Sequence, residues 1–392
     1  MWTNFTEFLT IFVNVMIDRI VLSPYYLVLA IRNMLYDKGI LASRKADVPT
    51  ICVGNVTVGG TGKTPHVELI LRMLGETEEW SGSHLAVLSR GYKRESSGFQ
   101  QVTDRGSAAM FGDEPFQIKK KNPGVTVAVD KDRLEGCRFL ASPGELGKSR
   151  AGRKCWNRDF PASDLIVLDD AFQYRKLVAD LNVVLVDFNR PVFEDSLLPF
   201  GRLRDLPGRI FKADALIVTK CVQGMTQEEK ACFLKRLHYT DFDPVTSTAL
   251  NRRGVRQHVF FTYIKYEAPK NVYVTSNPRY FYTKKIVLFT GIANNIPFRN
   301  YLSDSYKILK LFNFEDHHKF SDRDIRKITD IIRENPTAAV VTTEKDAQRI
   351  LDYVGMPENL TDRMFYIPIS SEFVTGEEKE KFRELLSGLR RS

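Results

Sequence analysis

Short runs of apolar residues recur along the chain and alternate with longer amphipathic segments. Runs without internal polar positions are typical of strands that are buried on both faces of a parallel sheet. The segments between them have helical spacing, and strands that alternate with helices indicate βαβ units. The pattern therefore predicts an α/β fold with a mostly parallel sheet flanked by helices. The runs lie at 51–53, 85–89, 125–129, 164–170, 181–187, 215–219, 286–290, 338–342 and 365–369.

The pattern changes near residues 240–250. The segment 255–274 contains short apolar stretches separated by charged residues, which predicts an antiparallel hairpin. Beyond it, apolar runs again alternate with helical segments, so we expect a second, smaller α/β domain joined through a β-hairpin linker. The predicted division is an N-terminal helical segment at 1–40, a larger domain at 41–245 and the smaller domain at 246–392.

The first 40 residues contain apolar stretches at 8–17 and 20–31, interrupted by Asp18-Arg19 and Ser23-Pro24. Neither stretch reaches the ~20 residues that a membrane-spanning helix needs, and a signal peptide is not expected without a basic start and a cleavage site. Interspersed aromatic and basic residues are typical of helices in a membrane interface. Ordinary core helices give a similar pattern, and both interpretations hold if one face docks and the other meets lipid.

Composition adds a preference for anionic partners. Hydrophobic residues make up 43% of the chain, the formal net charge is +9 and the pI is about 9.1. A basic balance favours nucleotides, nucleic acids, phospholipids or phosphorylated substrates. The five cysteines include no C-x-x-C pair, so neither a zinc site nor a disulfide framework is expected and a reducing cytosol is favoured.

The segment 51–65, ICVGNVTVGGTGKTP, joins an apolar run to an amphipathic segment through a glycine-rich loop. Strand, loop and helix in this order are what a phosphate-binding loop requires. Glycines let backbone N–H groups turn inward around phosphate oxygens, and the helix start favours an anion. The alternative is a glycine-rich turn that binds nothing. The predicted nucleotide-binding residues are Thr57, Val58, Gly59, Gly60, Thr61, Gly62, Lys63 and Thr64.

A second motif supports a nucleotide site in the domain at 41–245. The run DLIVLDD at 164–170 ends in Asp169 and Asp170. This Walker-B pattern places a carboxylate at the carboxyl edge of the sheet, where Asp169 and the Thr64 hydroxyl would hold Mg²⁺. The alternative is a turn at the end of a strand.

Acidic and histidine-containing motifs lie elsewhere. GDEP at 112–115 opens a predicted helix, where carboxylates often only complement the helix dipole. DHH at 316–318 could suggest a metal site, but adjacent histidines point in different directions, so a histidine held by a carboxylate for acid–base chemistry is favoured. The basic stretch 142–160 is predicted to be a surface loop.

With these motifs in view, the chain resembles the tetraacyldisaccharide 4'-kinases, the lipid A 4'-kinases of Gram-negative bacteria, over nearly its whole length. Thr57 at the first loop position is also what that family has. The family commonly has His at position 174 and Glu at 205, where this chain has Tyr174 and Asp205, and 142–160 looks like an insertion. The resemblance rests on VGNVTVGGTGKTP (53–65), SRGY (89–92), GDEP (112–115), LDDAFQYR (168–175), LLPFGRLRD (197–205), GIAN (291–294), DHH (316–318) and TEKDA (343–347).

The resemblance implies transfer of the ATP γ-phosphoryl group to the 4'-hydroxyl of a tetraacylated glucosamine disaccharide 1-phosphate, with Mg²⁺, to give a lipid IVA type product. It also implies a peripheral protein at the cytoplasmic face of the inner membrane, attached through residues 1–40, without a nucleic-acid or obligate protein partner. The implied catalytic residues are Asp113 as base, His317 paired with it, Asp170, and Arg204 with Arg202 for developing charge; Glu114, Asn294 and Glu344 would support them.

Two other functions are compatible with parts of the sequence. A membrane-recruited P-loop ATPase that switches a protein partner would account for the phosphate loop, DLIVLDD and residues 1–40. A non-catalytic nucleotide- or lipid-binding scaffold would not need Asp113. The ATPase does not account for the acidic GDEP and DHH motifs or for a second α/β domain, and the kinase is the favoured function.

Overall fold

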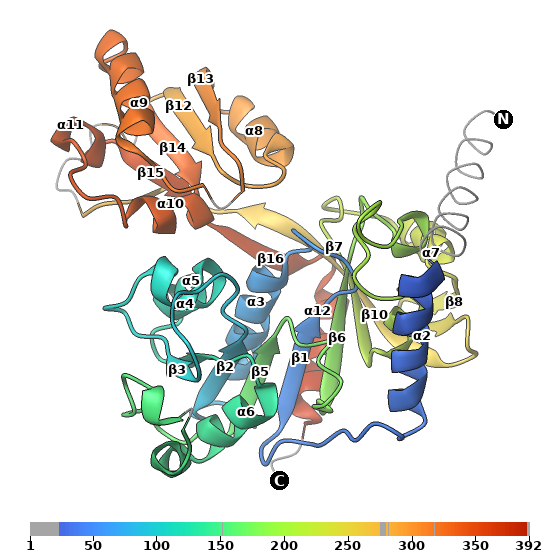
Figure 1. Cartoon of the computed structure of the whole chain (residues 1–392). Helices are drawn as coiled ribbons and strands as arrows, with labels where there is room; N and C mark the ends of the chain where they lie inside the picture. Colours follow the sequence, from blue (N-terminus) through green and yellow to red (C-terminus); the bar gives the residue numbers. More distant parts are fainter. Residues whose placement is uncertain (1–22, 151, 275–279, 281, 317, 390–392) are drawn as a thin grey trace.

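The computed structural model describes residues 23–150, 152–274, 280, 282–316 and 318–389. Within these residues the strands form one sheet of eleven strands and one of five. Figure 1 shows the smaller sheet and its helices set apart from the larger one, with β10 and β16 running between them. An α/β architecture with a large, mostly parallel sheet is thus confirmed.

The larger sheet has the strand order β3-β4-β2-β5-β1-β6-β7-β10-β9-β8. Its strands from β4 to β10 pair in parallel, and β1, β2, β4, β5 and β7 are buried at every position. Burial on both faces explains their unbroken apolar runs. The strands are β1 (Thr50–Gly54), β2 (Leu85–Ser89), β3 (Gln100–Gln101), β4 (Thr126–Val129), β5 (Leu165–Asp169), β6 (Leu181–Asp187), β7 (Ala215–Thr219), β8 (Tyr239–Asp243), β9 (Thr248–Asn251), β10 (Arg256–Tyr266) and β16 (Ile369–Phe373).

Helices cover both faces of this sheet. The apolar sides of α3, α5 and α12 share one core with Ile51 and Val53 of β1. On the opposite face, α2, α6 and α7 share a second core with Cys52. Side chains of one strand alternate between the two cores, as the two-residue period requires. The helices are α2 (Ser23–Asp37), α3 (Lys63–Glu76), α4 (Ala108–Phe111), α5 (Asp113–Lys121), α6 (Arg133–Ala141), α7 (Gln227–Arg236) and α12 (Gly376–Ser387).

The smaller sheet has the order β11-β15-β14-β12-β13. Its four longer strands pair in parallel, and β11 adds antiparallel to β15. Ile325, Ile328 and Ile332 of α9 lie in one of its cores, and Phe298 and Leu302 of α8 lie in the other. The elements are β11 (Lys270–Asn271), β12 (Lys285–Thr290), β13 (Lys307–Asn313), β14 (Ala339–Thr343), β15 (Met364–Ile367), α8 (Ile296–Ser303), α9 (Asp322–Glu334), α10 (Glu344–Ile350) and α11 (Glu358–Thr361).

Two strands connect the sheets, and here the structure differs from the predicted hairpin. Most of the segment 255–274 is one long strand, β10, which pairs with β7 and β9 through its first half and with β16 through residues 262–266. Pro368 separates β15 from β16, so the apolar run 365–369 is divided between the two sheets. We refer to residues 262–266 and 369–373 as the linker.

The observed boundary between the two sheets also differs from the one predicted at residue 245. The strands β10 and β16 and the helix α12 follow that boundary, yet they belong to the larger sheet and its core. The physical reason is aromatic packing, because Phe373 and Phe382 lie against Phe260 with ring centroids 5.9 and 5.1 Å apart. The strands of the smaller sheet lie between residues 270 and 367.

Helix α2 docks on the larger sheet through one side only. Leu29 and Asn33 are buried, whereas Leu27, Val28 and Met34 on the other side are 57, 61 and 44% exposed. Residues 1–22 of the predicted N-terminal segment lie outside the described residues. Among the residues described, no helix combines the length and apolar character needed to cross a bilayer.

The stretch 142–160 is more firmly anchored than the predicted surface loop. It contains two short 3₁₀ helices, η2 (Pro143–Lys148) and η3 (Gly152–Lys154). Leu146, Cys155 and Phe160 insert into the core, so part of the segment belongs to the packed interior of the larger sheet and its helices.

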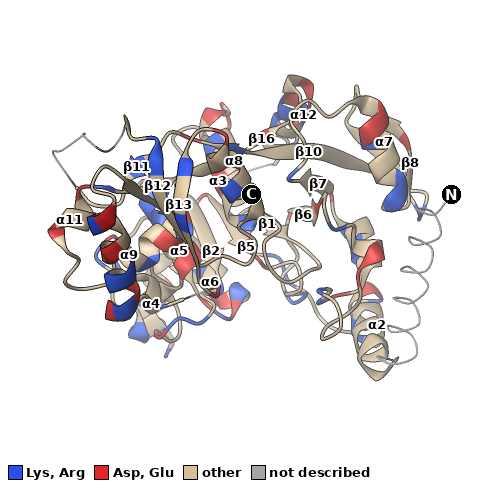
Figure 2. Cartoon of the chain, turned by 90° about the horizontal axis from the view of Figure 1, so that it is seen from above, with Lys and Arg blue, Asp and Glu red and all other residues tan. Residues whose placement is uncertain are grey.

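Charge is mixed rather than segregated on α7, α9 and α12, where Figure 2 shows basic and acidic residues side by side.

Candidate active site

The phosphate loop follows β1 and leads into α3. Gly59, Gly60 and Gly62 have φ values of +77°, +35° and +85°, a backbone region that side chains disfavour and that turns N–H groups into a common concavity. Helix α3 begins at Lys63, so the free N–H groups of its first turn face the same concavity. The arrangement suits an anion such as a nucleotide phosphate.

Neighbouring elements hold the loop from two sides. The amide of Val58 donates to the Arg202 carbonyl at 2.7 Å, and the Thr219 hydroxyl at the end of β7 donates to the Thr61 carbonyl at 3.0 Å. The buried Asn55 amide donates to the Thr61 hydroxyl at 2.6 Å. These contacts hold the loop in place from the segment at Arg202, from β7 and from Asn55.

Asp170 lies beside the loop and is paired with two cations. Both of its oxygens accept from the Arg204 guanidinium, in one case at 2.9 Å, and Lys63 Nζ lies 3.8 Å from Oδ1. Burial raises the pKa of Asp170, but Arg204 and Lys63 outweigh burial, so the pKa lies below its usual range. The structure thus brings together Lys63, Asp170 and Arg204, with Asn55 accepting from Arg204.

Asp169, at the end of β5, is fully buried. The Ser89 hydroxyl donates to Oδ2 at 3.0 Å, while Oδ1 has no hydrogen-bond partner among the described residues. Burial raises the pKa of Asp169 to about 7, and the carboxylates of Glu114 and Asp170 add to the effect. An unpartnered buried carboxylate oxygen beside a phosphate loop is chemically suited to a divalent cation.

We call each sheet together with its helices a unit. Asp113, the first residue of α5, lies against the smaller unit. Its Oδ2 accepts from Nε and Nη2 of Arg349 at 2.9 and 2.8 Å. Arg349, on α10, also donates to Asp346 and to the Gly291 carbonyl. The predicted partner of Asp113, His317, lies outside the described residues, so the pairing stays a prediction.

Two predicted supporting residues have other contacts. Glu344 accepts from Lys121 at 2.9 Å, and the Asn294 side chain accepts from the amide of Ile296 at the start of α8. Neither contact involves the phosphate loop. Their support of the catalytic residues stays a prediction.

Three residues with contacts at the site were not among the predicted site residues: Asn55, Ser89 and Arg349. Asn55 directly follows β1, and Ser89 ends β2, so both lie at the carboxyl edge of the sheet, where ligands bind in such folds. That position was a usable signal. Arg349 lies one helical turn after Asp346, which marks their pairing, but nothing local indicates its contact with Asp113.

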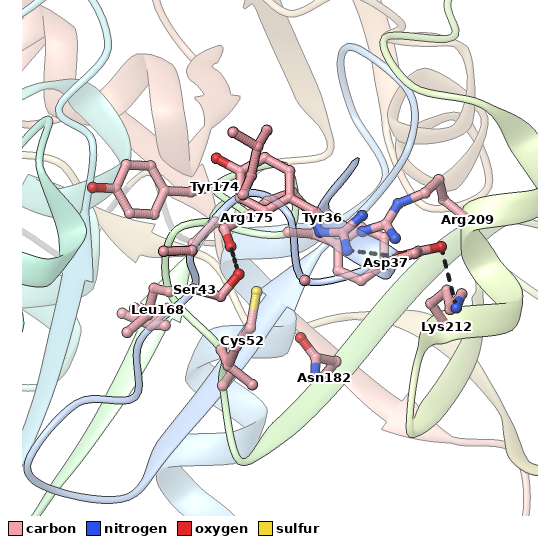
Figure 3. Close-up of a pocket in the computed structure, with 18 residues that line it drawn as sticks. Tyr36, Asp37, Ser43, Cys52, Leu168, Tyr174, Arg175, Asn182, Arg209 and Lys212 are labelled. Atoms are coloured by element: carbon pink, nitrogen blue, oxygen red, sulfur yellow. Dashed lines mark hydrogen bonds and ion pairs between the residues drawn. The ribbon is translucent and has the colours of Figure 1, made fainter. Parts of the chain in front are cut away.

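A separate cavity of about 580 Å³ is lined by Tyr36 and Asp37 at the end of α2 and by Cys52 on the face of the larger sheet opposite α3 (Figure 3). Arg175 and Lys212 both pair with Asp37 there, at 2.7 and 3.2 Å, and Arg209 lines the same space. No residue predicted for the nucleotide site lines this cavity. It is therefore distinct from the phosphate loop.

Comparisons with known proteins agree with the site. A profile of the family described as tetraacyldisaccharide-1-P 4'-kinase matches residues 19–390. The tetraacyldisaccharide 4'-kinase of Bacteroides thetaiotaomicron is 34% identical over 377 residues, or 93% of this chain and 90% of the relative. That of Phocaeicola vulgatus is 35% identical over 351 residues, or 89% of this chain and 88% of the relative. A crystal structure of LpxK from Aquifex aeolicus in complex with ATP aligns with a TM-score of 0.64 and 28% identity, covering 94% of this chain and 98% of that one. Profile and relatives span nearly the whole chain, which therefore belongs to the tetraacyldisaccharide-1-P 4'-kinase family.

Proposed function

We propose that this chain transfers the γ-phosphoryl group of ATP to the 4'-hydroxyl of a tetraacylated glucosamine disaccharide 1-phosphate. The observation that carries the proposal is the phosphate loop of residues 57–64, with positive φ at three glycines, beside Asp170 at the carboxyl end of β5. The relatives named tetraacyldisaccharide 4'-kinase and the ATP complex of the Aquifex aeolicus protein support it.

In this reaction the bond between the γ-phosphorus and the bridging oxygen of ADP breaks, and a bond forms from the 4'-oxygen to that phosphorus. Phosphoryl transfer depends on alignment and charge neutralisation more than on covalent chemistry. The loop amides and Lys63 would hold the phosphates, and Arg204, already beside Lys63 through Asp170, would stabilise developing negative charge.

Asp113 would accept the proton of the 4'-hydroxyl. It begins α5 and contacts α10 of the smaller unit through Arg349, so an acceptor bound between the two units would reach it. His317 would pair with Asp113 and tune its basicity. We expect Asp113→Asn to lower transfer at least about 100-fold, the usual contribution of a general base, while ATP binding persists.

Mg²⁺ would be held by Asp169 Oδ1 and the Thr64 hydroxyl. The fit rests on the unpartnered, buried Oδ1 atom and on the preference of Mg²⁺ for oxygen ligands. When bound, the ion would neutralise phosphate charge. Asp170 follows Asp169 directly and is held by Arg204. Its carboxylate would position a water molecule or the metal ion.

The acceptor lipid stays in a bilayer, so the enzyme must reach the membrane surface. The exposed apolar side of α2, formed by Leu27, Val28, Ile31 and Met34, supports attachment through the N-terminal segment. We propose that the chain is a peripheral protein at the cytoplasmic face of the inner membrane.

The test is transfer of labelled phosphate from ATP to a tetraacyl disaccharide 1-phosphate in mixed micelles, with and without Mg²⁺. Labelled lipid that depends on both additions is the expected result. ATP hydrolysis without labelled lipid would favour a membrane-recruited ATPase instead. Nucleotide binding with neither product would favour a non-catalytic scaffold.

A further inference from the structure

His66 connects the phosphate loop to the linker between the two sheets. Its side chain is fully buried on α3. Nδ1 lies 2.7 Å from the Gly62 carbonyl oxygen and 3.3 Å from Ser371 Oγ, and Nε2 lies 2.9 Å from Thr262 Oγ1. Thr262 is the first residue of β10 that pairs with β16, and Ser371 lies on β16 itself. One ring therefore contacts the last glycine of the loop and both linker strands.

The contacts determine the protonation of the ring. A carbonyl oxygen can only accept, so Nδ1 carries a proton and donates to Gly62. Nε2 lies 2.9 Å from Thr262 Oγ1 and is placed to accept from that hydroxyl, whose other acceptor, the Val218 carbonyl, is farther away at 3.4 Å. Each nitrogen makes a directional bond away from water, where such bonds are strongest.

The bond to Gly62 acts on the peptide that faces the phosphate. The Gly62 carbonyl accepts both the His66 backbone amide, at 3.2 Å, and the ring. The Gly62–Lys63 peptide is planar and trans, so its N–H points opposite to the carbonyl. With the carbonyl directed at His66, the Lys63 N–H points out of the helix start, toward a bound anion. Gly62, at φ +85°, has no side chain that could fix this peptide.

We propose that His66 is a positioning residue that couples the phosphate loop to the linker. The position of the two linker strands sets the orientation of the Gly62–Lys63 peptide, and a bound nucleotide in turn holds the linker. Coupling of this kind is reciprocal. The proposal rests on the proposed function only in requiring that the loop bind nucleotide phosphates.

The first test removes the linker end of the contact and leaves the loop untouched. Thr262→Val deletes the hydroxyl that donates to His66 and should raise both the Kd and the KM for ATP about fivefold or more, with a smaller change in kcat. Thr342→Val is the matched control, because Thr342 is an equally buried strand residue whose hydroxyl donates to the Phe289 carbonyl in the smaller sheet at 2.9 Å. The control should leave ATP binding unchanged.

The second test separates the two ends of the ring. His66→Asn retains a donor for Gly62 and loses the reach to Thr262, whereas His66→Gln retains reach toward Thr262 and loses the bond to Gly62. In the unmodified chain, ATP should slow amide hydrogen exchange at residues 262–266 and 369–373. Both variants should lose this protection, and Asn should retain tighter ATP binding than Gln.

Three results would overturn the proposal. The first is that Thr262→Val and Thr342→Val bind ATP with equal affinity. The second is that ATP still slows hydrogen exchange in the linker of both His66 variants. The third is that His66→Asn and His66→Gln lose ATP binding to the same extent. If Thr262→Val melts well below its control, Ser371→Ala takes its place and should raise the Kd for ATP. An unmodified chain that binds no ATP would instead contradict the nucleotide site, and the coupling with it.

Discussion

The unpartnered oxygen of Asp169 gives the nucleotide site a pH dependence. The raised pKa of about 7 means that this carboxyl is largely protonated at pH 6, and a protonated carboxyl is a poor cation ligand. We therefore expect Mg²⁺-dependent ATP binding to strengthen as the pH rises from 6 to 8. Calorimetric titration of ATP at fixed Mg²⁺ across this range measures the effect.

Asp169→Asn supplies the control for that titration. It should bind ATP with little dependence on Mg²⁺ or pH. Without a cation, a folded-state pKa above the usual value of 3.8 means that stability falls as the pH rises from about 4 to about 7. Asp169→Asn should lack this fall in the free energy of unfolding between about pH 4 and about pH 7. If the Mg²⁺-dependent affinity of the unmodified chain for ATP stayed constant from pH 6 to 8, Asp169 would not be the Mg²⁺ ligand that we propose.

Arg349 is a second residue whose removal should be costly. Its side chain is 7% exposed, and its guanidinium lies between Asp113 and the fully buried Asp346. Arg349→Met leaves a buried carboxylate without its cation and should lower the free energy of unfolding by about 3–5 kcal/mol. Arg349→Lys keeps the charge but not the fork of donors, so an intermediate loss is expected. Urea unfolding measures both variants, and equal stability of Arg349→Met and the unmodified chain would contradict the expectation.

The residues of the nucleotide site were predictable where one sheet edge gathers them. Lys63, Asp169 and Asp170 follow apolar runs that the sequence marks as parallel strands, and such strands end at a common edge. The contact of Arg349 with Asp113 spans 236 positions and has no local signal. It depends on how two separately folded sheets meet, which no periodicity encodes.

At the scale of elements, apolar runs predicted strands well, since β2, β6 and β7 have the predicted bounds. The run 365–369 failed as one strand because Pro368 cannot donate to a ladder, and its two sides pair with different sheets. The return of β16 and α12 to the larger sheet was also not predictable, because their partners are more than 100 positions away in the chain.

Helix α2 carries a prediction about membrane attachment. Leu27→Gln/Val28→Gln changes two side chains that are more than half exposed, so folding should be unaffected. If this face enters the membrane interface, each change removes about 1 kcal/mol or more of apolar burial, and binding to anionic vesicles should weaken at least about tenfold. Co-sedimentation measures the binding.

The matched control for α2 lies in the smaller unit. Leu351→Gln/Val354→Gln removes the same two residue types at positions that are 42 and 91% exposed. It should leave vesicle binding unchanged. Equal binding by both double variants would contradict attachment through α2.

At the scale of the whole molecule, a partly buried charge cluster joins the two units in addition to the linker. Lys121 of α5 donates to Glu68 of α3 at 2.8 Å and to Glu344 of α10 at 2.9 Å. It also donates to the Ile369 carbonyl at the start of β16. One ammonium group thus faces two carboxylates, and it links the larger sheet, the smaller sheet and the linker.

Burial raises the pKa of Glu68 to about 7, and the nearby charge of Glu344 adds to the effect while Lys121 opposes it. Since the usual value is 4.5, this group stabilises the fold at low pH, and the contribution is lost as the pH rises through about 7. We therefore expect Glu68→Gln, which resembles the protonated acid, to raise the free energy of unfolding at pH 8 and to change it little at pH 5. Asp169 and Asp130 also titrate in this range, so the measure is the difference between the two chains in urea unfolding at each pH. A difference that stays constant from pH 5 to pH 8 would mean that Glu68 does not change its charge in the folded protein.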